Sequence, residues 1–230
     1  MDWWRIVCCA AAGYLLGSCN GAIVVSHTCM HDDIRKKGSG NAGLTNFLRN
    51  FGGWATLLVV LMDMGKVVLA CLLGRWLLPG NPQLGMMIAG AMTELGHIFP
   101  VFYGFRGGKG ILSSAALAIM MDWRIFVIGF SLFLIIVFAT HYVSLGSILA
   151  ATAYAVLFVI FFPGQPWIWS IAIAMAVLAI FMHRSNISRL LHGTETKTYL
   201  LKSKKKGGIF HAGNDRRQRR LGHGPCHSAA

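Results

Sequence analysis

Charged residues are scarce in this chain, and acidic residues are the scarcest of them. Only 13% of the 230 residues are charged, and Asp and Glu together number 8, whereas a soluble domain usually carries about a quarter charged residues. Hydrophobic residues make up 55% of the chain and gather in long stretches with almost no charge. This composition excludes an ordinary soluble domain and predicts a membrane protein. Its backbone groups must bond within each span, which favours helices.

Signatures of several other protein classes are missing as well. The six cysteines form no C-x-x-C pair, and four of them lie in apolar stretches, so they predict small buried residues and no disulfide framework. There is no Walker P-loop, no nucleotide-binding fingerprint, no cluster of metal ligands and no internal repeat. We therefore expect neither a metal nor a cofactor.

Seven apolar stretches are candidate membrane helices. They cover residues 3–26, 52–78, 84–103, 111–121, 124–140, 144–162 and 167–183. A straight span needs about 20 apolar residues, so the fourth stretch is too short to cross alone, and six or eight helices are the competing counts. Turns are predicted at Pro79-Gly80-Asn81-Pro82 and at Pro163-Gly164-Gln165-Pro166. The first stretch has no basic region beyond Arg5 and no clear cleavage site, which favours a retained span over a signal peptide.

Basic residues gather in three regions, and these regions predict the orientation. The regions are residues 35–49, residues 106–109 and the chain from Arg184 onward, and together they hold seventeen of the 21 Lys and Arg. With seven spans they all lie on one side, which the positive-inside rule places in the cytoplasm. The predicted fold class is therefore an all-α integral membrane protein of about seven transmembrane helices, with the N-terminus outside and the C-terminus cytoplasmic.

The chain divides by composition near residue 198. Residues 1–198 would form the membrane domain, and residues 199–230 are rich in Lys, Arg and Gly. We expect these last residues to form a disordered cytoplasmic tail on anionic lipid. Nucleic acid is not an expected partner, because aromatic residues do not alternate with the basic ones.

The segment DIRKKGSGNAGLTNFLR, from Asp33, is dense in glycine and in hydrogen-bond donors. Its glycines allow a tight turn with N–H groups pointing inward, and such a concavity binds anions. Its arginines can grip a phosphate through paired bonds. A flexible polar loop is the alternative interpretation. The predicted phosphate-binding residues in it are Arg35, Gly38, Ser39, Gly40, Asn41, Gly43, Thr45, Asn46 and Arg49.

A second glycine-rich segment, GHIFPVFYGFRGGKG from Gly96, surrounds Lys109 with glycines. Open backbone and one mobile ammonium suit an anion, although a basic loop that merely obeys the orientation rule is the alternative. Where the last apolar stretch ends, His183 and Asn186 lie three residues apart and would share a helix face. Together the segments predict a site that holds one phosphate from both sides, or two phosphates.

Few charged residues lie within the apolar stretches. Asp63 and Lys66 are three apart and can pair. Two roles stay open for Glu94, a buried structural partner or a group with chemistry. Ser144 begins the sixth stretch, and it could act as a helix cap or as part of the site.

Five segments together resemble one known family. They are GSCNGA from Gly17, DIRKKGSGNAGLTNFLR from Asp33, GHIFPVFYGFRGGKG from Gly96, THYVSLGSI from Thr140 and HRSNISRLLHGTETK from His183. In order and with similar spacing, between about Gly13 and Lys197, they resemble the motifs of the acyl-phosphate:glycerol-3-phosphate acyltransferases, the PlsY family.

The resemblance implies an enzyme of the bacterial inner membrane with its active site at the cytoplasmic face. Its substrates would be acyl phosphate and glycerol 3-phosphate, and the acyl chain would pass to the 1-hydroxyl, giving lysophosphatidic acid and phosphate. The resemblance further implies catalytic roles for Ser18, Lys109, His183 and Asn186, and a phosphate-binding role for Ser144 beside the first loop. The open backbone around Lys109 itself predicts Gly107 and Gly108 as phosphate-binding residues.

Acyl phosphate carries a good leaving group, so the reaction needs orientation and charge stabilisation more than a strong nucleophile. The chain has no H-x-x-x-x-D and no G-x-S-x-G motif, and we expect direct attack by the substrate hydroxyl with no acyl-enzyme. His183 could be a general base or a donor to phosphate, and its neighbour Asn186, which can only bond, favours the donor role.

Two other functions are possible for a membrane protein with anion sites. One is a transporter for a phosphorylated small molecule, and the other is a non-catalytic scaffold for lipid enzymes. A transporter usually carries its charged groups near the middle of the bilayer and shows repeats. Here the candidate residues gather at one face, which favours an enzyme. The sequence does not indicate an oligomeric state.

Overall fold

The structure of the protein, a computed structural model, describes residues 3–198, and all regular elements within that range are helical. In chain order they are α1 (Trp3–Ser18), α2 (Gly21–Thr28), the short 3₁₀ helix η1 (Ile34–Lys36), α3 (Leu44–Asn50), α4 (Gly53–Leu77), α5 (Pro82–Ile98), the 3₁₀ helix η2 (Val101–Tyr103), α6 (Ile111–Met121), α7 (Trp123–Thr140), α8 (Val143–Phe161), α9 (Pro166–Met182) and α10 (Arg184–Leu191). The expected basic tail, residues 199–230, lies outside the described residues.

Each of the seven apolar stretches is helical, but they differ in their ability to cross a membrane. Within residues 3–198, five segments have the length and hydropathy of a span: α1 with α2, α4, α5 with η2, α7 and α8. The pair α9 and α10, bent by 55°, is a sixth candidate. Helix α6 has 11 residues, or about 17 Å, roughly half of the hydrocarbon core. The seven-span count therefore stays a prediction.

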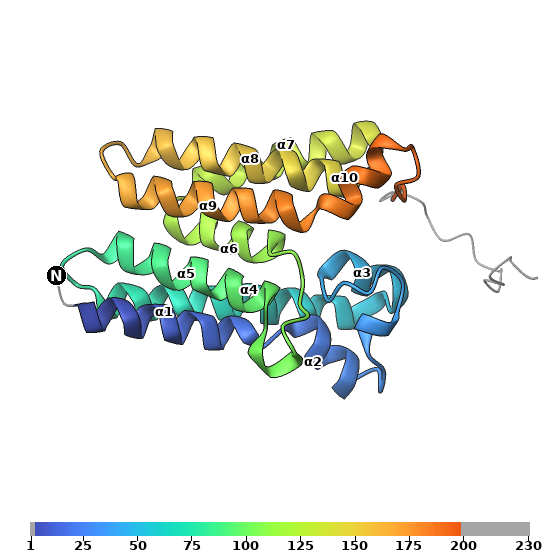
Figure 1. Ribbon diagram of the computed structural model, residues 1–230, viewed down its shortest axis with the longest axis horizontal. Coiled ribbons are helices and arrows are strands. Elements are labelled where there is room, and N and C mark those ends of the chain that lie inside the picture. The colour runs from blue at the N-terminus through green and yellow to red at the C-terminus, as the bar shows by residue number, and fades with distance from the viewer. Residues whose placement is uncertain (1–2, 199–230) are drawn as a thin grey trace, which may run out of the picture. The chain divides into compact units, whose positions relative to one another are not determined.

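The helices form two groups with α6 between them (Figure 1). Helices α1, α4 and α5 pack against one another, α7 and α9 both pack on α8, and α6 contacts both groups. Glycines permit the closest crossings: a Cβ at Gly17 would lie 2.1 Å from the backbone oxygen of Thr93, and one at Gly74 would lie 2.2 Å from that of Gly85. Such small residues let helices meet backbone to backbone in lipid, where association depends on packing.

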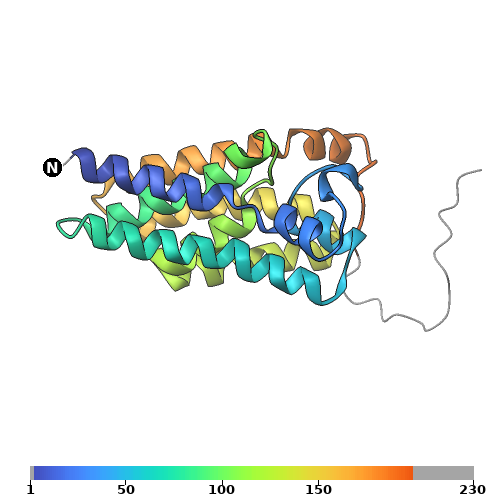
Figure 2. The ribbon, with the colours of Figure 1, turned by 90° about the horizontal axis from the view of Figure 1, so that it is seen from below.

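The predicted turns and breaks agree with the structure. The turn before Pro82 joins α4 to α5, and Asn81 caps α5 by accepting a hydrogen bond from the Leu84 N–H at 3.1 Å. Asn20 separates α1 from α2 and caps α2 through the Ile23 N–H. Figure 2 shows α2, α3 and α10 at the end of the molecule remote from the N-terminus. The loops that carry the conspicuous motifs therefore gather at one end of the described helices.

The predicted pair of Asp63 and Lys66 is present, and it ties three helices together. The carboxylate and ammonium lie 2.8 Å apart with both side chains buried. Lys66 Nζ also donates to the Gly17 carbonyl at 3.0 Å and lies 3.1 Å from His97 Nδ1. Charges inside spans need such partners. The cluster joins α1, α4 and α5 beside the second glycine-rich segment, because Gly108 lies against the His97 ring.

Candidate active site

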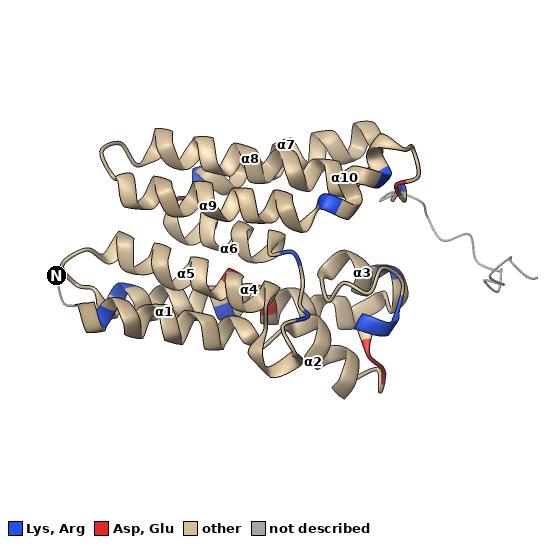
Figure 3. Ribbon diagram, viewed as in Figure 1, with Lys and Arg blue, Asp and Glu red and all other residues tan. Residues whose placement is uncertain are grey.

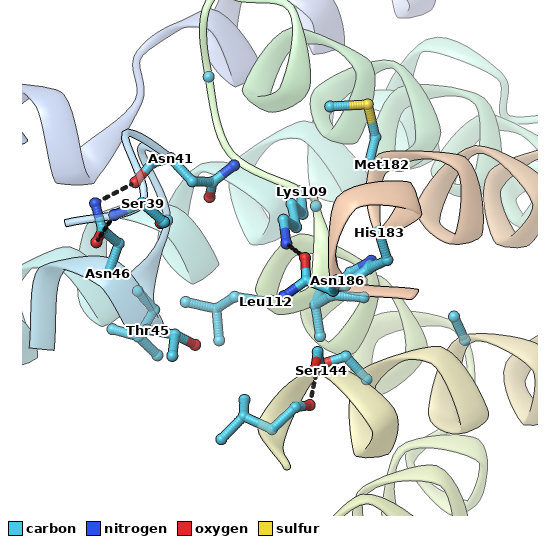
Figure 4. Close-up of a pocket in the computed structure, with 18 of the residues that line it drawn as sticks. Ser39, Asn41, Thr45, Asn46, Lys109, Leu112, Ser144, Met182, His183 and Asn186 are labelled. Carbon is cyan, nitrogen blue, oxygen red and sulfur yellow. Dashed lines mark hydrogen bonds between the residues drawn. The ribbon is translucent and has the colours of Figure 1, made fainter. Parts of the chain in front are cut away.

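A cavity of about 1000 Å³ opens between the two glycine-rich loops and helices α3, α6, α7, α8 and α10. Every residue proposed from the sequence for binding or chemistry lines it, except Ser18 and Gly108. Figure 4 shows its polar end, where Ser39, Asn41, Thr45 and Asn46 lie opposite Lys109, Ser144, His183 and Asn186. Folding thus brings segments that are distant in the sequence to one cavity.

Asn46 shapes the first glycine loop from inside. Its Nδ2 donates to the carbonyls of Lys37 and Asn41, both at 3.0 Å, and its Oδ1 accepts from the Ser39 N–H at 3.1 Å. Gly40 has a φ of 72°, in the left-handed region that favours glycine. The sequence predicts Asn46 as a phosphate ligand, but its amide is used to hold the loop in shape.

Other side chains of this loop face the cavity and are available to a ligand. Asn46 bonds only the backbone of Ser39 and Asn41, and within residues 3–198 no hydrogen bond uses the side-chain polar groups of Ser39, Asn41 or Thr45. Their hydroxyl and amide groups can therefore bond a bound molecule without breaking contacts of the fold.

The two arginines of the first loop also line the cavity, but each already has a partner. Arg35 pairs with Asp33 at 2.9 Å and donates to the Tyr103 carbonyl at 2.9 Å. Arg49 donates to the Thr198 hydroxyl at 2.5 Å. A phosphate at either guanidinium would share it with these partners, and five N–H donors on each make sharing possible.

The second glycine loop supports Lys109, and the N–H groups of Gly107 and Gly108 are used within the fold. The Gly107 N–H donates to the Ile98 carbonyl at 3.1 Å, and the Gly108 N–H donates to the His97 carbonyl at 3.0 Å. A Cβ at Gly108 would lie 2.1 Å from His97 Nε2. The sequence predicts both glycines as phosphate ligands. In the structure they allow a close approach that turns Lys109 toward the cavity.

A hydrogen-bond network joins this loop to α8, to α10 and to the chain beyond it. Lys109 Nζ donates to Asn186 Oδ1. Asn186 Nδ2 donates to Glu195 Oε1 at 2.7 Å, and the Ser144 hydroxyl donates to the same oxygen at 2.8 Å. Arg189 Nε donates to Glu195 Oε2 at 2.7 Å. The network orders the Lys109 side of the cavity.

Glu195 is the residue that reasoning from the sequence missed. Its signal was an acidic residue in the last matching segment, HRSNISRLLHGTETK, whose other charged residues are basic. Burial opposes its charge, but the hydrogen bonds from Asn186, Ser144 and Arg189 outweigh burial and lower its pKa. Six Lys and Arg line the cavity against two carboxylates, so the polar end remains positive and suits an anionic ligand.

Burial also changes the acidity of Lys109. Loss of water around the ammonium lowers its pKa from 10.5 to about 8. The negative charge of Glu195 opposes this shift, whereas the positive charges of Arg189 and Arg49 reinforce it. With a pKa of about 8, the Lys109 amine begins to lose its proton in mildly alkaline solution, and a bound phosphate would favour its protonated form.

His183 stands where α9 bends into α10, and its contacts define one ring nitrogen as a donor. Nδ1 lies 2.7 Å from the Ala179 carbonyl, which can only accept, so Nδ1 carries the hydrogen. In the neutral ring Nε2 is then an acceptor, and the residue lines the cavity. The sequence alone favours a donor to phosphate, which Nε2 can be when the ring is protonated; in the neutral ring this backbone contact makes Nε2 an acceptor.

Ser18 lies outside the cavity wall. Its fully buried hydroxyl donates to the Tyr14 carbonyl at 2.9 Å and accepts from the Val101 N–H at 3.3 Å. These bonds fasten α1 to the start of the second loop. We therefore interpret Ser18 as a positioning residue, in contrast to the catalytic role implied by the resemblance.

The other end of the cavity is apolar and lies between α7 and α8. It is lined by Gly129, Phe130, Phe133, Ala150, Ala151 and Tyr154. A cavity that is positive at one end and apolar at the other fits an amphiphilic molecule with an anionic head and a hydrocarbon chain.

Comparisons with known proteins identify a family for this chain. Residues 7–193 match the family model described as glycerol-3-phosphate acyltransferase. A protein of that name from Thermoanaerobacter sp. (strain X514) is 42% identical over 188 residues, which cover 82% of this chain and 93% of that protein. Another, from Finegoldia magna, is 37% identical over 197 residues, which cover 86% of this chain and 98% of that protein.

Two solved structures are similar in fold and sequence. One is PlsY, an integral membrane glycerol 3-phosphate acyltransferase, in its glycerol 3-phosphate form; its TM-score is 0.77 at 31% identity, and 84% of this chain and 96% of that chain are covered. The other is the lysophosphatidic acid form of PlsY, with a TM-score of 0.73 at 30% identity, covering 84% of this chain and 94% of that chain.

Proposed function

This chain belongs to the glycerol-3-phosphate acyltransferase family of the PlsY type and is an integral membrane enzyme, and we propose that it moves a fatty acyl group from acyl phosphate to the 1-hydroxyl of sn-glycerol 3-phosphate. The products are lysophosphatidic acid and inorganic phosphate. The observation that carries the proposal is that one cavity has both a positive polar end and an apolar end. Both substrates have an anionic phosphate, and the donor also has a hydrocarbon chain.

At the polar end, two groups of side chains on opposite sides of the cavity can each bind one phosphate. On one side the free side chains of Ser39, Asn41 and Thr45, with Arg35 and Arg49 behind them, suit the phosphate of glycerol 3-phosphate. On the other side Lys109, beside Asn186, suits the phosphate of the donor, which becomes the leaving group. A charge-assisted contact to the leaving phosphate strengthens as its charge grows, so it stabilises the transition state more than the ground state.

The chemical step is a direct displacement. The 1-hydroxyl oxygen attacks the acyl carbon, the bond from that carbon to the phosphate oxygen breaks, and the phosphate leaves with the electron pair. Ser144, a hydroxyl close to the site, donates to Glu195 and is not bonded to His183; the lowered pKa of Glu195 makes its carboxylate a weak base, poorly suited to activate this hydroxyl as a nucleophile. This arrangement supports transfer without an acyl-enzyme.

We assign His183 Nε2 as the acceptor for the hydroxyl of glycerol 3-phosphate. Because Nδ1 is occupied by the Ala179 carbonyl, Nε2 presents a lone pair to the cavity. Such an acceptor orients the attacking oxygen. It can then pass the released proton to a phosphate oxygen or hold it as a general base.

Two variants of His183 separate these roles. Asn places its amide near the Nδ1 position, whereas Gln places an acceptor near Nε2. If Nε2 only orients the hydroxyl, His183→Gln should keep far more activity than His183→Asn. If Nε2 must take the proton, the turnover numbers of both variants should fall alike, and saturating glycerol 3-phosphate should rescue neither. The measurement is kcat and KM across glycerol 3-phosphate concentration, with each variant checked for folding by size-exclusion chromatography.

The donor is tested directly with purified protein. Acyl phosphate and labelled glycerol 3-phosphate should give labelled lysophosphatidic acid, and acyl-CoA should not replace acyl phosphate. The matched control is Lys109→Ala, which should lose about 30- to 1000-fold in rate, corresponding to roughly 2–4 kcal/mol for a charge-assisted contact in a partly dry site. Turnover with acyl-CoA alone would overturn the proposed donor.

The orientation that we propose has seven spans, an outside N-terminus and the site at the cytoplasmic face of a bacterial inner membrane. Basic residues gather at the end of the helices that carries α3 and α10 (Figure 3). Four exposed tryptophans lie at the other end, Trp3, Trp4, Trp76 and Trp167, and the exposed Trp54 begins α4 at the basic end. Such rings mark membrane interfaces, and Lys and Arg mark the cytoplasmic side. A periplasm-only reporter should be active at Met1 and silent after Ala230, and the reverse pattern would refute this orientation.

A further inference from the structure

The apolar end of the cavity is a groove whose side along α8 is built from small residues. The face of α8 that lines it carries Ser144, Ser147, Ala150 and Ala151, and then ends at Tyr154. These positions recur at intervals of three and four residues, so they form one stripe along the helix. The small side chains leave room for a groove beside the stripe, and Tyr154, the first large side chain, closes that groove.

Tyr154 closes the groove by reaching across to α7. A Cβ built at Gly129 would lie 2.1 Å from Tyr154 Cε1, so the ring rests on the bare backbone of the opposite helix. Tyr154 is 9% exposed. Because neither helix has a lining residue farther from Ser144 than this pair, the contact forms the end of the groove.

The depth of the groove matches a fatty acyl chain. Ser144 and Tyr154 are ten residues apart on α8, which corresponds to about 15 Å at 1.5 Å per residue. One leaflet of a bilayer has a hydrocarbon thickness of about 15 Å, half of the core. An acyl chain that starts at the polar end would therefore reach Tyr154 with its terminal methyl.

A second, smaller cavity of about 30 Å³ lies behind Tyr154. Ser114, Ala151 and Tyr154 line both cavities, so they form the partition between them. The smaller cavity is also lined by Glu94, which is 1% exposed and whose Oε1 has no hydrogen-bond partner among the described residues. An apolar chain pushed past the partition would lie against this carboxyl group and deprive it of any water that it holds.

We propose that Tyr154, resting on Gly129, is the residue that sets the longest acyl chain the enzyme transfers efficiently. The proposal rests on the proposed function, because it assigns the apolar end of the cavity to the acyl chain of the donor. It adds a specificity determinant far from the reacting atoms.

The test is a chain-length profile of kcat/KM with acyl phosphates from decanoyl to arachidoyl. In the unmodified enzyme kcat/KM should increase with the length of the acyl chain up to a limiting length, beyond which it no longer increases. Tyr154→Ala should move that limit to longer chains, with a gain of about fourfold for each further methylene that finds room. Ala151→Leu fills the groove one turn nearer the head group, so its limit should move to shorter chains.

Phe138→Ala is the matched control, because Phe138 is an exposed aromatic residue of α7 outside the cavity lining. Its profile should be that of the unmodified enzyme. If Tyr154→Ala does not fold, the opposite shift in Ala151→Leu tests the proposal by itself. Unchanged limits in folded Tyr154→Ala and Ala151→Leu would overturn the chain-length role alone. Absence of transfer from every acyl phosphate in the unmodified enzyme would instead overturn the proposed function.

Discussion

The lowered pKa of Lys109 predicts a loss of activity in mildly alkaline solution. Only the ammonium form can hold the leaving phosphate, and burial lowers the pKa of this group from 10.5 to about 8. The charged form is therefore complete below the lowered pKa and is lost as the pH rises through it. At pH 9 about one-tenth of Lys109 would still carry its charge, whereas at a pKa of 10.5 about nine-tenths or more would.

The quantity to measure is kcat/KM for acyl phosphate, because it reports groups of the free enzyme and Lys109 is assigned to the phosphate of that donor. It should be level near pH 7, fall to about half near pH 8 and then drop roughly tenfold for each further pH unit. The phosphate of glycerol 3-phosphate titrates near pH 6, so its own ionisation is complete over this range. Spontaneous hydrolysis of acyl phosphate is measured without enzyme at every pH and subtracted.

Lys109→Arg provides the matched control. A guanidinium keeps its charge throughout this range, so the alkaline fall should vanish even if the overall rate is lower. A level profile up to about pH 10 in the unmodified enzyme would refute the reasoning, because Lys109 would then be fully hydrated or would not bind the phosphate. The same fall in Lys109→Arg would assign it to another group.

Three further predictions follow from the contacts around the site. Glu195→Gln removes the negative charge that opposes the shift at Lys109, so the alkaline fall in kcat/KM should move to lower pH; an unchanged profile would contradict the coupling. Gly108→Ala places a Cβ 2.1 Å from His97 Nε2 and should lower kcat/KM at least about tenfold, whereas Gly80→Ala, which meets nothing within 4 Å, should keep it. Because the proposed step needs no metal, activity should survive dialysis against EDTA, and loss that added Mg²⁺ restores would argue against that mechanism.

The structure bears out the parts of the fold that depend on local sequence. The hydropathy pattern places a helix over residues 111–121, and α6 has those bounds. The turn before Pro82 is equally local, because proline cannot continue a helix interior but can begin one. The pairing of Asp63 with Lys66 follows from their spacing on one helix. In each case the interactions that form the feature are between residues close together in the sequence.

The site residues were recognisable as a set, but several of their individual roles were not. Asn46 looks like a ligand in the sequence, and only the folded loop shows that its amide bonds residues 37 to 41. The Gly108 N–H looks available, and only the packing against α5 shows that the His97 carbonyl takes it. A donor's partner is decided by whatever the fold brings within about 3 Å, and spacing along the chain does not contain that information.

Glu195 and His183 show the difference between what the sequence indicates and what depends on the tertiary structure. The sequence by itself determined that the chain is helical and built for a membrane, and it singled out two glycine-rich basic loops and a polar segment after the last apolar stretch, because composition and periodicity act locally. Only the tertiary structure decided that Glu195 joins the network of Ser144, Asn186 and Arg189, and that Nδ1 of His183 is occupied by the Ala179 carbonyl. Charge, tautomer and acidity depend on burial and on partners, and these exist only once distant segments have packed together.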